Sequence, residues 1–253
     1  MLNFLKKKKI IPVVHMSGII GNIGGLRNGI TISSIENLLE KAFKIKNSAA
    51  VAIIINSPGG SPVQSSLIYK RIKKLAKKKK SKVIFFVEDV AASGGYYIAC
   101  AGDEIYASYG SLVGSIGVKG PDWIYFDKPI SMSSGIFGKA IETEYGIKVY
   151  SQNAGKSKDL FNPFRQPTKE ELQNIQLLID DIYDDFVNLV SKKRKIEINI
   201  IKSKIGALIY NSRHAKNNYL IDGEINLNLL ILLHRGKSWQ NQGELKFHSY
   251  TSY

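Results

Sequence analysis

The sequence predicts an α/β domain built on a mostly parallel sheet, and two observations support this fold class. Short runs of β-branched and other apolar residues alternate along the chain with amphipathic segments, which is typical of βα units. The apolar runs are also continuous, as in AVAIIIN at residues 50–56, and this is the pattern of strands buried on both faces. With 253 residues, 44% of them hydrophobic and 23% charged, the chain is long enough for one sizeable globular domain.

The order of elements follows from these patterns. Strands are predicted at residues 10–16, 50–56, 82–88 and 104–108, and a short buried helix is predicted at 94–102. A first amphipathic helix is predicted to begin at Ser33, with Glu36 as its capping-box partner. A second begins at Ser61, which is followed by proline. A long third helix begins at Thr168, with Glu171 as its capping-box partner.

Three parts are expected along the chain: a basic segment at residues 1–9, a single domain at 10–233 and a polar, irregular tail at 234–253. Within the domain, residues 119–134 combine proline, glycine and aromatic residues without a clear period, which indicates a loop or lid. Cys100 is the only cysteine, so an internal disulfide framework is excluded and a reducing compartment is favoured. Cys100 lies in a run that looks buried and has no nearby base, which argues against a thiol catalyst.

The net charge is +15, and much of it comes from lysine-rich clusters at residues 5–9, 70–82 and 192–195. A nucleic-acid partner is not expected, because these clusters are neither interleaved with aromatic residues nor set on a recognised motif. An anionic membrane surface is a better candidate, since clustered lysines contribute on the order of 1 kcal/mol each there. Solvated helix faces explain the same pattern equally well.

The sequence shows neither an apolar run of about 20 residues nor a signal-peptide pattern. We therefore expect a cytoplasmic protein, at most peripheral to the inner membrane. Neither a metal nor a cofactor is expected. Four carboxylates on the long third helix favour a solvated face over a metal site, because no histidine or ordered loop spacing accompanies them: Asp180, Asp181, Asp184 and Asp185.

Ser93 lies between small residues, in VAASGG, after the predicted strand 82–88 and before an apolar helix. A serine at such a corner can expose its hydroxyl, and the helix N-terminus favours developing negative charge. A nucleophile, a helix N-cap and a small residue at a crowded packing point are all compatible with this pattern. Gly59 and Gly60, in INSPGGSP after the preceding strand, allow backbone amides to point toward an oxyanion. Each loop alone is also typical of an ordinary turn.

A serine nucleophile needs a base. The four histidines lie outside loops with a glycine or carboxylate context, which disfavours a Ser-His-Asp triad: His15, His214, His234 and His248. A lysine can act instead if desolvation leaves its amine neutral. Lys156 and Lys158 lie in a loop bounded by Gly155 and by an apolar group made of Leu160, Phe161 and Phe164. The residue chemistry alone does not choose between the two lysines.

Four segments, taken in order, resemble the signal peptide peptidase A family of serine peptidases in its short, single-repeat form: INSPGGSPVQSSLI, EDVAASGGYYIACAGDEIYAS, GSLVGSIGV and GKSKDLFNPFRQPTKEEL. The resemblance covers roughly residues 10–233. It implies a Clp-protease/crotonase-like fold of repeated ββα units with C-terminal helices. It also implies a serine endopeptidase with a Ser–Lys dyad that cleaves unstructured hydrophobic peptides, such as remnant signal peptides.

By position in these motifs, the resemblance implies Ser93 as the nucleophile and Lys158 as the general base. It implies an oxyanion hole at Gly59, Gly60 and Gly94, and Ser115 as the residue that holds the lysine amine. Lys156 precedes the base in the same motif. In single-repeat members the serine and lysine of one site come from neighbouring subunits of a ring, so a homo-oligomer is expected.

The chain departs from the family pattern in three places. Residues 119–132 resemble an insertion, a lysine cluster stands where many members have an N-terminal membrane anchor, and Tyr219 stands where glycine is common.

Two alternative functions remain open on the same fold. An acyl-CoA hydratase or isomerase would need an acid/base glutamate, and none stands in the three loops. A catalytically silent membrane quality-control or assembly factor is the other, and the retained serine and lysine count against it.

Overall fold

The computed structural model describes residues 10–22, 29–120, 122, 131–135, 138–142, 148–150, 152–225 and 246–251. The chain divides into two compact units. Unit 1 comprises residues 1–117 and 183–253, and unit 2 comprises residues 118–182.

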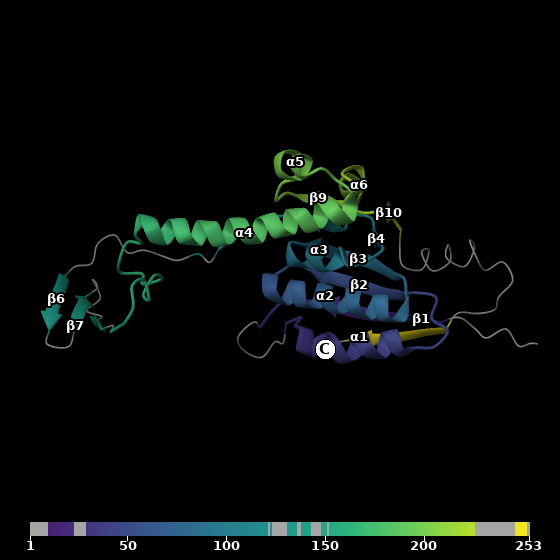
Figure 1. Ribbon diagram of the computed structural model, residues 1–253, viewed down its shortest axis with the longest axis horizontal. Helices are drawn as coiled ribbons and strands as arrows, with labels where there is room; N and C mark the ends of the chain where they lie inside the picture. Colours follow the sequence, from purple (N-terminus) through teal and green to yellow (C-terminus); the bar gives the residue numbers. More distant parts are fainter. Residues whose placement is uncertain are drawn as a thin grey trace, which may run out of the picture. The chain divides into compact units, whose positions relative to one another are not determined.

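An eight-stranded sheet forms the centre of unit 1 (Figure 1). Its main path has the order β10-β4-β3-β2-β1-β11, with all neighbours parallel: β1 (Ile10–Ser17), β2 (Val51–Ser57), β3 (Val83–Ala92), β4 (Glu104–Ala107), β10 (Gly223–Glu224) and β11 (Lys246–Thr251). β5 (Leu112–Gly114) pairs parallel with the end of β3 and antiparallel with β9 (Ile209–Asn211). The predicted α/β class with a parallel sheet is confirmed.

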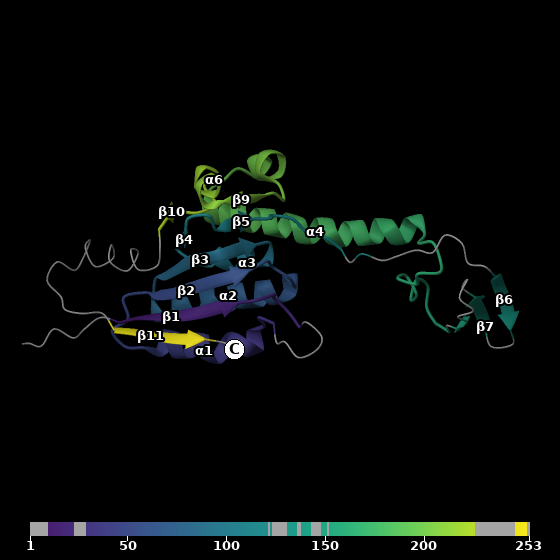
Figure 2. The ribbon, with the colours of Figure 1, turned by 180° about the vertical axis from the view of Figure 1, so that it is seen from behind.

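Three helices of unit 1 cover one face of this sheet, as the two opposite views in Figures 1 and 2 show: α1 (Ile32–Lys44), α2 (Pro62–Lys79) and α3 (Gly94–Ala99). Alternate side chains of the central strands are fully buried in the main core, among them Ile53, Ile55, Phe85 and Val87. The side chains in between are also buried, in a smaller cluster with Ile54 and Phe86. Burial on both faces explains why these strands are continuous apolar runs.

α2 begins as predicted, with Ser61 as its N-cap and Pro62 as its first residue. The predicted start of α1 at Ser33, with Glu36 as the capping-box partner, is wrong. The N-cap is Thr31, whose hydroxyl accepts from the Ser34 amide at 3.2 Å, while the Ser34 hydroxyl accepts from the Thr31 amide at 3.0 Å. Several hydroxyl side chains compete as caps within this short stretch, so local sequence did not identify the one used.

The tail at residues 234–253, predicted to be irregular, contains β11. This strand pairs in parallel with β1, from Ile10 opposite Lys246 to His15 opposite Thr251. Its position depends on backbone hydrogen bonds to a strand more than 230 residues away in sequence, so the polar composition of the segment did not reveal it.

Unit 2 contains a three-stranded antiparallel sheet of β6 (Ser131–Gly135), β7 (Gly138–Glu142) and β8 (Lys148–Tyr150). The predicted loop at residues 119–134 lies largely outside the described residues, and its last four residues form most of β6. The long α4 (Lys169–Arg194) begins in unit 2 and ends in unit 1. Its predicted capping box is confirmed, because Glu171 accepts from the Thr168 amide at 2.8 Å and donates its own amide to the Thr168 hydroxyl at 3.2 Å.

α4 is followed by α5 (Ile198–Ile200), a π-helical turn η1 (Ile201–Ile205) and α6 (Ser212–Asn217). Tyr219, which stands where glycine is common in the resembling family, follows α6 with a positive φ of 60°. This left-handed conformation is the one that glycine adopts without cost at a helix C-terminus.

Candidate active site

An irregularity in β3 directs its end toward the candidate site. β3 pairs regularly with β2 up to Val87 and resumes pairing at Ala91, which lies opposite Ser57. Residues 88–90 therefore have only Asn56 opposite them, a bulge-like shift of the register. β3 pairs with β4 up to Val87 and with β5 from Val90 onward. Because a bulge bends its strand, it changes the direction of the residues that follow.

Ser93 occupies the corner between β3 and α3. Its backbone has φ 52° and ψ −122°, a strained conformation for a non-glycine residue that costs about 1–3 kcal/mol. The Ser93 amide donates to the Gly114 carbonyl at 2.9 Å, which anchors the corner to β5. Ser93 stands at the N-cap position of α3, but its side chain makes no capping hydrogen bond, and it is only half-buried. A capping role therefore does not account for this serine.

The glycine turn after β2 lies against this corner. Gly59 and Gly60 have φ values of 109° and 142°, which glycine adopts more readily than any other residue. A β-carbon on Gly59 would lie 2.8 Å from Cβ of Ser93 and 3.0 Å from the Gly94 nitrogen. The two loops, 34 residues apart in sequence, thus approach so closely that only glycine fits at position 59.

The backbone amides at this corner differ in whether they already donate a hydrogen bond within the protein. Gly59 donates its amide to the Ser57 hydroxyl at 3.2 Å. On either side of Gly60, Ile20 donates to the Gly59 carbonyl and Ser61 donates to the Ile20 carbonyl, each at 2.8 Å. The Gly60 amide therefore faces away from Ile20, and its nitrogen lies 3.4 Å from where a β-carbon on Gly94 would be. Within the described ranges, neither the Gly60 nor the Gly94 amide donates a hydrogen bond.

Ser115 directly follows β5, as Ser93 directly follows β3. The last paired residues of β3 and β5 are Ala92 and Gly114, and the two serines directly follow this pair. Ser115 also has a positive φ, 54°, and its amide donates to the Leu208 carbonyl at 2.7 Å. Unit 1 therefore brings together all the predicted site residues except the lysine.

Lys158 lies in unit 2, in the turn before α4. Its amide donates to the Gly155 carbonyl at 3.3 Å, and its side chain is exposed. The apolar group expected to desolvate it is only partly buried itself, and Phe161 is 51% exposed. Burial of Lys158 therefore does not come from its own turn, and the pairing of Lys158 with Ser93 stays a prediction.

Lys156 differs from Lys158 in its partner. Its ammonium donates to a carboxylate oxygen of Glu170 at 2.7 Å, and this hydrogen bond raises the pKa of Lys156. A raised pKa makes the neutral amine of Lys156 rarer, which counts against this lysine as the base.

The other candidate nucleophile and bases lie elsewhere in unit 1. Burial raises the pKa of the Cys100 thiol to about 12, which keeps it protonated and unreactive. His15 lies on β1 opposite Ile54, and β2 separates it from β3. His214 is exposed on α6.

Two residues of structural importance for the site were not identified from the sequence. Ser57 is fully buried and fixes the glycine turn through the Gly59 amide. Arg165 makes a dense set of ion pairs next to Lys158. The sequence did contain a sign of this network, because Arg165 lies six residues after Asp159 and six residues before Glu171.

The model of Peptidase family S49 matches residues 75–232, more than half of the chain. This chain belongs to peptidase family S49. The predicted family and enzyme class, a serine-type peptidase related to signal peptide peptidase A, agree with this membership. The matched range contains Ser93, Gly94, Ser115 and Lys158, while the glycine turn precedes it.

Curated relatives of this S49 chain carry different names. A Na⁺/H⁺ antiporter NhaA of Brucella melitensis is 41% identical over 214 residues, which are 84% of this chain and 27% of that protein. A candidate protease of Methanocaldococcus jannaschii is 36% identical over 74% of this chain and 55% of its own length. A candidate signal peptide peptidase of Enterococcus faecium is 32% identical over 74% of this chain and 51% of its own length. The chain thus spans between about a quarter and about half of these relatives.

Solved structures confirm the fold of this S49 member. Two structures of a membrane-bound stomatin-specific protease, one a serine-to-alanine variant and one a lysine-to-alanine variant with a substrate peptide, each align with a TM-score of 0.56 at 16% identity. The alignments cover 96% of this chain and 99% and 93% of those chains. The predicted Clp-protease/crotonase-like fold is therefore confirmed.

Proposed function

We propose that this chain is a serine endopeptidase in which Ser93 is the nucleophile and Lys158 the general base. The observation that carries the proposal is the corner at Ser93. This serine has a strained backbone and makes no capping hydrogen bond, and it lies against the amides of Gly60 and Gly94, which have no acceptor among the described residues. Strain of this kind is concentrated at functional sites. Membership of family S49 supports the same reaction class.

The reaction follows from the chemistry of these groups. Neutral Lys158 takes the hydroxyl proton of Ser93 as its Oγ attacks the scissile carbonyl carbon. The amides of Gly60 and Gly94 donate to the resulting oxyanion, and one such donor is typically worth ~3 kcal/mol. Lys158 then gives the proton to the leaving amine, and water, activated by the same amine, hydrolyses the acyl-enzyme.

Gly59 and Ser115 have supporting roles in this proposal. Gly59 uses its amide internally, so its contribution is the room it leaves for the Ser93 corner. Ser115 stands beside the nucleophile, where its hydroxyl can hold the lysine amine by donating or accepting a hydrogen bond.

We further propose unstructured, hydrophobic peptides such as remnant signal peptides as the substrates. The exposed Phe161 and partly buried Phe164 give the turn around Lys158 an apolar surface. The likeness to the candidate signal peptide peptidase of Enterococcus faecium supports the same class.

A fluorophosphonate probe tests the nucleophile directly, since it forms a covalent bond only with an activated serine. We expect a single label, mapped to Ser93 by peptide mass spectrometry, on native but not on denatured protein. Absence of label at Ser93, with an unrelated serine peptidase labelled in parallel, would favour the catalytically silent alternative.

A homo-oligomer with shared sites is proposed for two reasons. Lys158 is exposed in the single chain, whereas a lysine base needs a desolvating neighbour. In addition, the first half of α4 exposes several large apolar side chains: Leu172, Leu178 and Ile182 are 44%, 58% and 40% exposed. Exposed apolar surface of this kind is typical of an interface between subunits.

Mixing two inactive variants tests the shared site. Oligomers formed from Ser93→Ala and Lys158→Ala chains are expected to regain part of the wild-type peptidase activity, because some sites then combine an intact serine with an intact lysine. The chains carry different affinity tags, so that mixed oligomers can be isolated by two successive purifications. Each variant assembled alone serves as the control. No recovery in doubly purified oligomers would place the dyad within one chain.

The basic residues support peripheral attachment to an anionic membrane surface. In the part of the chain that the structure describes, no helix is both long and apolar enough to cross a membrane. α2 ends with Lys77, Lys78 and Lys79, close to the start of β2 and at the opposite end of the strand from the candidate site. Lysines of both α1 and α2 line a hollow of about 290 Å³ there, without an acidic residue among its lining.

Salt-sensitive binding to anionic vesicles is expected from this cluster. Sedimentation with phosphatidylserine vesicles should fall several-fold as the ionic strength rises past about 0.15 M, where the Debye length is ~8 Å. Replacing Lys77, Lys78 and Lys79 with glutamine should reduce binding more than replacing three exposed lysines outside the basic clusters, namely Lys169, Lys204 and Lys216. Equal sedimentation with neutral and anionic vesicles would exclude electrostatic attachment, and tighter binding to RNA than to vesicles would point to a nucleic-acid partner instead.

A further inference from the structure

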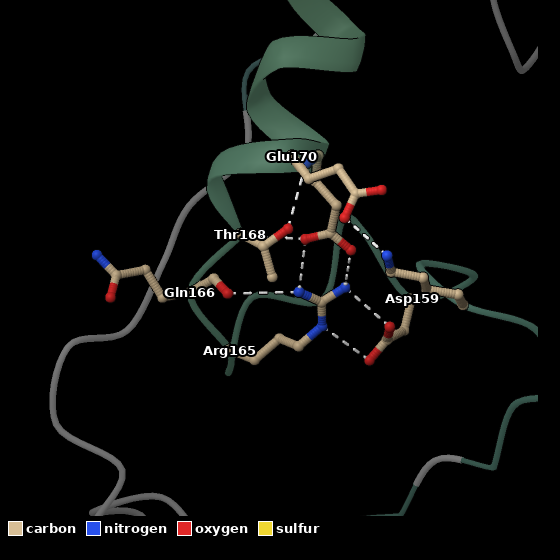
Figure 3. A network of polar contacts seen from close by, with 7 residues as sticks. Asp159, Arg165, Gln166, Thr168 and Glu170 are labelled. Carbon is tan, nitrogen blue, oxygen red and sulfur yellow. Dashed lines mark hydrogen bonds and ion pairs between the residues drawn. The ribbon is translucent and has the colours of Figure 1, made fainter.

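Arg165 is the centre of a polar network in unit 2 that Figure 3 shows from close by. Its guanidinium binds the Asp159 carboxylate through two hydrogen bonds of 2.9 and 3.0 Å, and the Glu171 carboxylate through two of 2.8 and 2.9 Å. A fifth bond, of 3.3 Å, reaches the Gln166 carbonyl. All five N–H groups of the arginine are therefore used, which no other side chain could reproduce.

The network joins the turn before α4 to the start of that helix. Glu171 is 6% exposed and is the capping-box residue of α4, so the arginine is held by a fixed part of the helix. Hydrogen bonds from the Arg165 guanidinium and the Thr168 amide hold the pKa of the Glu171 carboxyl well below its usual range. Glu171 is therefore ionised, and the network is intact, over the whole range in which a peptidase is assayed.

Lys158 lies directly before a residue of this network. Asp159, immediately after it, binds Arg165, which in turn binds Glu171 of α4. Ser157, immediately before it, has a positive φ of 61°. The backbone that follows Lys158 is thus fixed to α4, while the lysine side chain itself is exposed and has no partner among the described residues.

We propose that Arg165 is a positioning residue, which fixes the backbone next to Lys158, at Asp159, so that the amine is presented in one orientation. The inference rests on the proposed function of Lys158 as the base. It adds that the geometry of the base is set by an arginine fork seven residues away rather than by the lysine turn alone.

Arg165 also controls the charge around the base. The charged groups near Lys158 in unit 2 are Lys156, Asp159, Arg165, Glu170 and Glu171. Lys156 and Glu170 neutralise each other. The remaining charges are the carboxylates of Asp159 and Glu171 and the guanidinium of Arg165. Without the guanidinium two uncompensated carboxylates would favour the ammonium form of a nearby amine, so activity would require a higher pH.

Three variants separate geometry from charge. Arg165→Lys keeps the charge but cannot form the two-sided fork, so kcat should fall about 10- to 100-fold, with KM and the midpoint of the pH–rate profile nearly unchanged. Arg165→Gln should lower kcat similarly and move the midpoint upward by about 0.5–1 pH unit. Asp159→Asn removes one carboxylate and should move the midpoint in the opposite direction. A loss of stability would not move the pH midpoint upward in Arg165→Gln and downward in Asp159→Asn.

A matched control is available at the other end of α4. Arg194 binds Asp222 through two hydrogen bonds of 2.9 and 3.1 Å in unit 1, and Arg194→Gln should lower the melting temperature without displacing the pH midpoint. If Arg165→Lys and Arg165→Gln keep wild-type kcat and midpoint while Lys158→Ala is inactive, the positioning role is refuted and the proposed function stands. If Lys158→Ala is active, the base assignment fails, and the role of Arg165 fails with it. If Arg165→Gln does not fold, Arg165→Lys and Asp159→Asn still test the positioning role of Arg165.

Discussion

Replacement of Ser93 by alanine is expected to lower kcat/KM on a hydrophobic, unstructured peptide by about four orders of magnitude or more, because no nucleophile remains. The fold should persist. The Ser93 hydroxyl makes no capping hydrogen bond, and the β-carbon that contacts the glycine turn is retained in alanine. Alanine also bears the positive φ at about the same cost as serine. Peptide cleavage and the melting temperature, measured on one preparation, check both parts.

Ser203 provides the control for this variant. It is an exposed serine whose hydroxyl donates to a carbonyl one helical turn earlier, far along the chain from the site motifs. Ser203→Ala should keep wild-type turnover. Wild-type turnover in Ser93→Ala would overturn the mechanism, whereas loss of both activity and the melting transition would assign the serine a structural role.

Replacement of Lys158 is expected to have the second large effect. Lys158→Ala removes the base, and Lys158→Arg replaces it with a guanidinium that stays charged at every assay pH, so both should be inactive. Lys156→Ala should keep most activity, because the ion pair of Lys156 with Glu170 raises the pKa of this lysine and so disfavours the neutral amine that a base needs. These three variants differ at neighbouring positions of one exposed turn, so differences in folding between them should be small.

The pH dependence of the wild-type enzyme follows from the same assignment. A lysine acts as a base only in its neutral form, so activity should rise with pH along a single ionisation and level off once the amine has lost its proton. Activity in Lys158→Ala combined with inactivity in Lys156→Ala would move the base by two residues. If both alanine variants are active, the Ser–Lys mechanism is wrong.

Local sequence was enough for the elements whose determinants lie within a few residues of one another. The continuous apolar run at residues 50–56 predicted a strand buried on both faces, and β2 (Val51–Ser57) is such a strand. The N-cap Ser61 and the capping box of Thr168 and Glu171 were also predicted correctly, since each joins residues only three apart. The same reasoning failed at α1, where Thr31 rather than Ser33 caps the helix and Gln64 of α2 accepts from its first amide at 2.9 Å.

The sequence by itself determined the fold class, the family and the residue types of the site, because motifs and periodicity are properties of short segments. Only the tertiary structure decided that, among the described residues, the Gly59 amide has an acceptor in Ser57 while the Gly60 amide has none, and that Asp159 and Glu171 share Arg165. It also decided that β11 completes the sheet beside β1. Each of these features is a hydrogen bond whose direction depends on where the chain places a second segment, and a hydrogen bond is sensitive to both distance and angle. Such placement is fixed by packing of the whole domain and cannot be read from the residues on one side of the bond.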